Sequence, residues 1–194
     1  QLSSNKLYDG TALQVNAGYA IKGLGINGTF RRLENFSFFS DRLAEGNIFN
    51  QQVINYVPGL TKQQDYLLTN IYVYNPQPRL IIESFDQRAG EVGTQFDLYY
   101  SLKKGSSLGG KYGTKLAINF SYWAGLDAEY NIENRWYEAK FIGNGAQLFR
   151  DINFEIKKKW SKNWSSVFTY QNVIVDKGIV EGGPLGNSDI SANI

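Results

Sequence analysis

The sequence predicts an all-β fold, an antiparallel up-and-down transmembrane β-barrel or a contiguous slice of one, with about eight strands visible. The chain has 13 Tyr, 12 Phe, 4 Trp and 20 Gly, a composition that favours strands and turns. Apolar and polar residues alternate with a period of two over segments longer than most soluble strands. Short and long connections also alternate between these segments, as they do in bacterial outer-membrane barrels.

The first two strands are predicted near 12–22 and 24–33. Their apolar residues recur at every second position, so each strand has one apolar face. A two-residue turn at Lys22 and Gly23 would pair Ile21 with Leu24 and bring both apolar faces to the same side of the sheet. The apolar face of this hairpin contains Leu13, Val15, Tyr19, Ile21, Leu24 and Ile26.

Gly23, Gly25 and Gly28 have the spacing G-x-G-x-x-G of a dinucleotide-binding loop. That site requires a helix to begin on the glycines, because the helix N-terminus binds the pyrophosphate. The segment that follows, "TFRRLENFSFFSD", has no apolar series at helical spacing. We therefore expect strand and turn glycines, and no cofactor.

Four further strands are predicted in the middle of the chain, near 65–74, 79–86, 93–103 and 114–123. The first two flank "NPQP" and their alternation is too blurred to assign faces. The other two flank the turn "KGSSLGGKYG" and alternate clearly. Their apolar face contains Phe96, Leu98, Tyr100, Leu116, Ile118 and Phe120.

The last two strands are predicted near 148–160 and 164–175. A three-residue turn at 161–163 would pair Trp160 with Trp164 and align one apolar face, which contains Ile152, Phe154, Ile156, Phe168 and Tyr170. The closing "GGPLGNSDISANI" has the composition of a loop. We therefore treat 1–194 as a single domain and expect it to be a fragment of a larger barrel.

Periodicity alone does not decide which face of the sheet points outward. In a transmembrane barrel the apolar face contacts lipid, whereas in a lipocalin-like barrel or a soluble β-sandwich it forms the core. Strand length and the charges on the polar face favour the membrane, as do Trp123, Trp160 and Trp164, which are predicted at strand ends as an interfacial girdle. A soluble antiparallel β-sheet binding module remains the alternative.

Composition excludes several classes of function. The chain contains neither Cys nor His, so it has no thiolate or imidazole metal ligand and no histidine base. Its net charge of +2 is not gathered into a polybasic block, so nucleic acid is not an expected partner. We expect no metal site, no catalytic residues and no enzymatic activity.

Several long blocks, among them "FRRLENFSFFSDR", "VINYVPGLTKQQDYLLTNIYVYNPQP" and "EVGTQFDLYYSLKKGSSLGGKYGTKLAINFSYW", resemble an uncharacterised family of Bacteroidota outer-membrane β-barrel proteins, a domain of unknown function. The resemblance implies a location in the bacterial outer membrane, with the lipid bilayer and other outer-membrane or periplasmic proteins as partners. It implies no reaction and no ligand. The expected role is that of a channel, a scaffold, or a subunit or client of a larger envelope complex.

Overall fold

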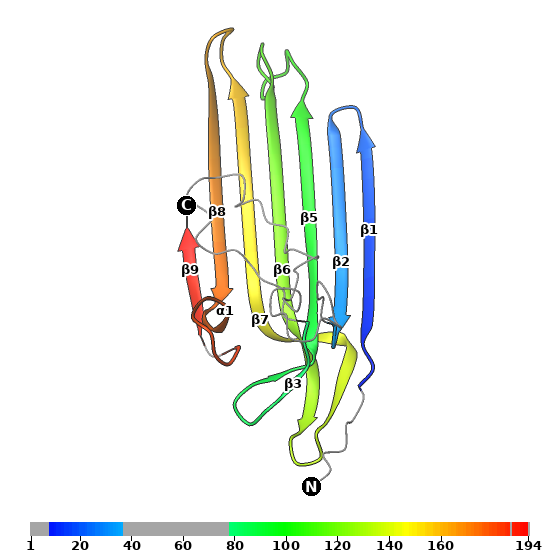
Figure 1. The fold of residues 1–194 in the computed structure, drawn as a ribbon. Helices are drawn as coiled ribbons and strands as arrows, with labels where there is room; N and C mark the ends of the chain where they lie inside the picture. Colours follow the sequence, from blue (N-terminus) through cyan, green and yellow to red (C-terminus); the bar gives the residue numbers. More distant parts are fainter. Residues whose placement is uncertain (1–7, 37–77, 187, 194) are drawn as a thin grey trace, which may run out of the picture.

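A computed structural model describes residues 8–36, 78–186 and 188–193. Their main feature is a 7-stranded antiparallel sheet with the order β1-β2-β5-β6-β7-β8-β9, beside a 2-stranded sheet of β3 and β4. Figure 1 shows the long strands side by side. Their bounds are Thr11–Ile21 (β1), Leu24–Glu34 (β2), Gly90–Leu102 (β5), Thr114–Asn131 (β6), Trp136–Lys159 (β7), Ser165–Asp176 (β8) and Asp189–Asn193 (β9). The predicted all-β antiparallel fold is confirmed.

The glycine motif belongs to the β1–β2 hairpin, as predicted. Ile21 pairs with Leu24 and Tyr19 pairs with Ile26. Gly23 has φ 87°, a conformation that a residue with a Cβ rarely adopts. Because residues after the turn continue as strand β2, no helix begins at these glycines.

The β7–β8 turn also has the predicted geometry. The Trp160 backbone N–H donates to the Trp164 carbonyl at 3.0 Å, and the two indole rings stack with centroids 5.8 Å apart. In Figure 1 this turn, the β1–β2 turn and the β5–β6 turn lie at one end of the sheet. We call this end the turn end.

The strands predicted near 114–123 and 148–160 imply a long loop at 124–147, which is wrong, because β6 and β7 continue through it as a hairpin that turns at residues 132–135. In Figure 1 this hairpin extends beyond the neighbouring strands and bends. Register shifts occur between Trp123 and Ala128, where β7 contains extra residues. These bulges interrupt the period-two pattern, so alternation in the sequence does not predict this part of β6 and β7.

The strand predicted at 79–86 is also wrong. This segment contains only β3 (Ile81–Ile82), which pairs with β4 (Gln87–Arg88) across a turn closed by the Glu83 N–H and the Asp86 carbonyl. Neither strand joins the large sheet, where β2 pairs directly with β5. The strand predicted at 65–74 lies outside the described residues.

The end of the chain is more regular than its composition suggests. Helix α1 (Lys177–Glu181) begins at Asp176, whose carboxylate accepts hydrogen bonds from the Gly178 and Gly186 N–H groups at 2.8 and 2.6 Å. Strand β9 then pairs with β8, so the prediction of a loop is wrong for residues 189–193. Within the described residues the sheet does not close, and β1 and β9 are its two edges.

Candidate functional site

The strand register places the predicted apolar residues in continuous rows on one face, which we call the outer face. Residues paired directly across antiparallel strands lie on the same side of a sheet. The row nearest the turn end consists of Ile21, Leu24, Tyr100, Leu116, Ile156 and Phe168. The next row consists of Tyr19, Ile26, Leu98, Ile118, Phe154 and Tyr170, and a third contains Phe96, Phe120 and Ile152. On β1, Val15 and Leu13 continue the same face.

Much of this outer face is accessible. Phe168 is 65% exposed and Tyr170 is 53% exposed. The other predicted outer-face residues that are exposed are Leu13, Val15, Tyr19, Ile21, Phe96, Tyr100, Ile118 and Phe154, and the remainder are half-buried. Trp160 and Trp164 are exposed beside these rows at the turn end. The face becomes more polar at the β8 end of the third row, where Asn172 pairs with Ile152 and accepts a hydrogen bond from Arg150 at 3.1 Å.

The opposite face, which we call the inner face, carries a polar row across four strands, buried on β6, β7 and β8 and half-buried on β5. Asp97, Asn119, Asn153 and Gln171 are aligned by direct pairing. The Asn119 amide donates to Asp97, and the Gln171 amide donates to both oxygens of Asp151 at 3.3 and 3.2 Å. Asn153 and Gln171 have no exposed surface. Polar side chains are thus buried on the inner face, opposite the exposed apolar rows.

Asn153 lies at the centre of this polar row. In the part of the chain that the structure describes, neither atom of its amide group has a hydrogen-bond partner. Among the described residues, the Asn119 and Gln171 amide oxygens have no hydrogen-bond partner either. A buried polar atom without a hydrogen-bond partner costs about 1 to 3 kcal/mol. We therefore expect polar groups to contact this row on the inner face.

Farther from the turn end than the polar row, the inner face contains an apolar cluster around Trp123. Trp123, Phe149, Val173 and Val175 pack together with Leu148, and Ile179 and Leu185 cover them. Trp123 is 1% exposed and lies inside β6. Its predicted place at a strand end, in an interfacial girdle, is therefore wrong.

Two neighbours determine the position of Trp123. Gly93 pairs with Trp123 across the sheet, and a Cβ at Gly93 would lie 1.9 Å from the indole ring. On the next strand the Arg31 guanidinium lies 4.2 Å from the ring centroid, in cation–π geometry, and forms an ion pair with Glu91 at 3.6 Å. Sequence reasoning missed this group, although a glycine inside a strand signals close approach of another group.

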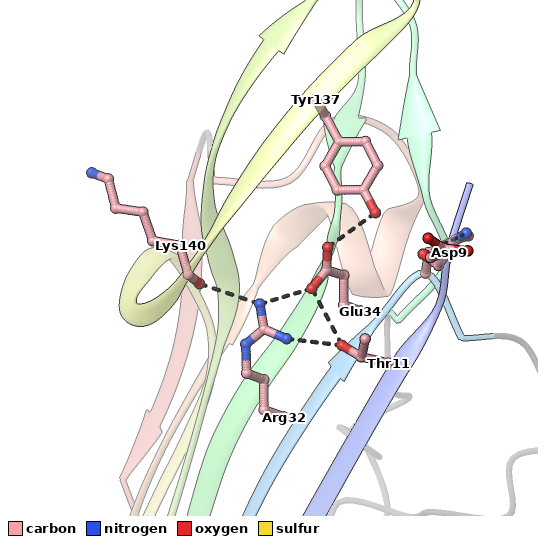
Figure 2. Close-up of polar contacts among 7 residues, drawn as sticks. Asp9, Thr11, Arg32, Glu34, Tyr137 and Lys140 are labelled. Carbon is pink, nitrogen blue, oxygen red and sulfur yellow. Dashed lines mark hydrogen bonds and ion pairs between the residues drawn. The ribbon is translucent and has the colours of Figure 1, made fainter. Parts of the chain in front are cut away.

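The bent β6–β7 hairpin is anchored to β2 by a second polar group, shown in Figure 2. The Arg32 guanidinium bonds Glu34 at 2.8 Å, the Thr11 hydroxyl at 3.1 Å and the Lys140 carbonyl at 3.3 Å. The Tyr137 hydroxyl donates to Glu34 at 3.1 Å. Burial and the Glu34 carboxylate raise the pKa of Tyr137, and burial raises the pKa of Tyr130 to about 12. Both phenols therefore stay protonated at neutral pH.

The described residues contain no group of three or more Cys, His, Asp or Glu side chains that could hold a metal ion. No helix in the same part of the chain is long and apolar enough to cross a membrane.

These features define an all-β protein whose antiparallel sheet exposes apolar rows on one face and buries polar side chains on the other. The chain belongs to the family described as "Family of unknown function (DUF6029)", whose model matches residues 2–194. No curated protein and no solved structure matches it.

Proposed function

We propose that this chain is part of a bacterial outer-membrane β-barrel without catalytic role, whose outer face contacts lipid. The observation that carries the proposal is the inverted polarity of the sheet: Phe168 and Tyr170 are exposed, whereas Asn153 and Gln171 are fully buried. A soluble sandwich or lipocalin buries its apolar face and hydrates the other one. A bilayer supports the opposite arrangement, because lipid is the solvent for the outer face.

Strand length agrees with this proposal. β1 and β2 each have 11 residues and β5 has 13, and about 9 to 11 residues cross a bilayer at a tilt. Trp160 and Trp164 lie at the turn end, where amphipathic rings suit the interface between headgroups and water. The aromatic level at the turn end would mark one surface of the membrane.

A barrel must also satisfy the backbone groups of its edge strands. In the described part of the chain β1 and β9 each have one neighbour in the sheet. Unpaired N–H and C=O groups are too costly in hydrocarbon, so we propose that strands of the same protein or of a partner protein pair with these edges. Outer-membrane or periplasmic proteins are the corresponding partners.

Among non-catalytic roles, the inner face favours a scaffold over an open channel. Asn119, Ser121, Asp151, Asn153 and Gln171 are all buried, whereas the wall of a wide pore is hydrated. We propose that this scaffold belongs to a larger envelope complex in the outer membrane of Gram-negative Bacteroidota.

Quenching of tryptophan fluorescence by brominated lipid tests the proposal. Two single-tryptophan proteins are refolded into vesicles, one retaining Trp164 and the other retaining Trp123. We expect quenching of Trp164, which is 63% exposed at the turn end, and none of Trp123, which is buried on the inner face. A protein that stays in solution without detergent and is quenched at neither position would support the soluble binding module.

A further inference from the structure

The turn end contains a basic cavity of about 400 Å³ between the β5–β6 turn and the β7–β8 turn. Five lysines contribute to its lining, accompanied by Trp164, Tyr112 and the hydroxyl residues Ser101, Thr114 and Ser165. The lysines are Lys104, Lys115, Lys157, Lys159 and Lys162. No carboxylate is among the described residues that line this cavity.

The lysines converge because of the strand register. Lys115 on β6 pairs directly with Lys157 on β7, so both side chains leave the same face, one row from Lys159. Within the described residues none of the five ammonium groups makes an ion pair with a carboxylate. Like charges directly opposite one another destabilise a sheet, and a bound anion would remove that repulsion.

Hydrogen bonds within and between the turns hold in place the residues that line the cavity. In the β5–β6 turn the Thr114 hydroxyl donates to the Leu108 carbonyl at 3.0 Å, and Ser106 Oγ accepts from the Gly109 N–H at 3.0 Å. The Lys159 N–H donates to the Gly113 carbonyl at 3.1 Å and joins this turn to β7. A fixed framework lowers the entropic cost of binding, since less of the site must be ordered by the ligand.

We propose that this cavity binds the phosphate groups of a small phosphorylated ligand. A phosphate monoester carries about 1.5 to 2 negative charges at pH 7 and three acceptor oxygens, which match clustered ammonium donors and hydroxyls. Lysine binds phosphate as a point charge. A cavity of about 400 Å³ is within the usual size of a small-molecule site. The ligand is a soluble phosphorylated solute or a phosphate-bearing lipid headgroup, and the proposal holds whether or not the outer face contacts lipid.

The test uses two triple variants that remove equal charge from the same end of the sheet. The pocket variant carries Lys115→Gln, Lys157→Gln and Lys162→Gln. The control variant carries Lys22→Gln, Lys103→Gln and Lys111→Gln, none of which lines the cavity. Circular dichroism and thermal unfolding in detergent establish that both variants fold like the unchanged chain.

Calorimetric titration with inorganic pyrophosphate measures the soluble source. We expect the pocket variant to lose at least about tenfold in affinity, since one charge-assisted hydrogen bond already corresponds to that factor, and the control variant to change by less than about threefold. Equal losses in the two variants would show general attraction to a basic rim and would overturn the proposal.

Co-sedimentation with vesicles measures the headgroup source, with phosphatidylglycerol compared against phosphatidylcholine. Pyrophosphate binding without preference between the vesicles assigns a soluble ligand. A preference for phosphatidylglycerol that only the pocket variant loses assigns a headgroup. If neither pyrophosphate nor phosphatidylglycerol binds to the unchanged chain, the cavity is not a phosphate site.

Discussion

Replacing Phe154 with arginine places a charge on the proposed lipid-facing surface. Phe154 lies in the second apolar row and is 38% exposed. From residue 154 to Trp160 a strand rises about 20 Å, which is about 15 Å along the membrane normal at a tilt of about 40°. That distance is about half of a hydrocarbon core of about 30 Å. If Trp160 marks the interface, Phe154 is near the bilayer centre.

Arginine near the bilayer centre costs about 2 to 4 kcal/mol in a barrel, so the Phe154→Arg variant should lose about 30- to 700-fold in its folding equilibrium. Urea-dependent refolding into phosphatidylcholine vesicles, followed by tryptophan fluorescence, measures this loss. The adjacent Asn153 is a poor control because it is fully buried, and a larger side chain there would overpack the inner face.

The matched control is Asn27→Arg. Asn27 is exposed, pairs with Asp97 and belongs to the same cross-strand row as Asn153, so it lies on the inner face. A new arginine opposite Asp97 should change stability by less than about 1 kcal/mol. Equal losses for Phe154→Arg and Asn27→Arg would refute the assignment of the outer face to lipid.

Three further predictions follow from the inner face, the hairpin anchor and the two ends of the sheet. Gly93→Ala should lower the free energy of unfolding by about 1 to 3 kcal/mol through overpacking against Trp123, whereas Gly25→Ala, with nothing within 4 Å of its new Cβ, should be neutral; NAD should shift the melting temperature of neither variant. Tyr137→Phe should destabilise the hairpin by about 1.5 kcal/mol at pH 7, because the hydrogen bond to Glu34 is lost. Because the folded pKa of Tyr137 is raised, its contribution should be complete below about pH 10 and disappear as the pH rises above that value, as tyrosinate absorbance and proteolysis of the hairpin would record. A single cysteine replacing Asn131 should be labelled in intact cells, and one replacing Lys162 only after permeabilisation, because long hairpins of barrels face outward. Labelling of position 162 alone in intact cells would reverse the topology.

The sequence by itself determined the regular part of the sheet. Alternation with a period of two is a local property of a strand, so the apolar faces around Ile118 and Phe154 could be read from neighbouring residues. The two-residue turn at Gly23 and the three-residue turn between Trp160 and Trp164 then determined register, because turn length decides which residues are opposite one another. Both pairings occur in the structure.

Tertiary structure decided what local alternation does not encode. The bulges after Trp123 extend β6 and β7 into a hairpin whose Tyr137 meets Glu34, and bulges break the very period by which strands are recognised. Trp123 is buried because Gly93, on the neighbouring strand, leaves room for its ring. The lysine cavity likewise depends on strands β6 and β7 bringing Lys115 opposite Lys157. Such contacts join residues far apart in the chain, so they arise only when the strands pair.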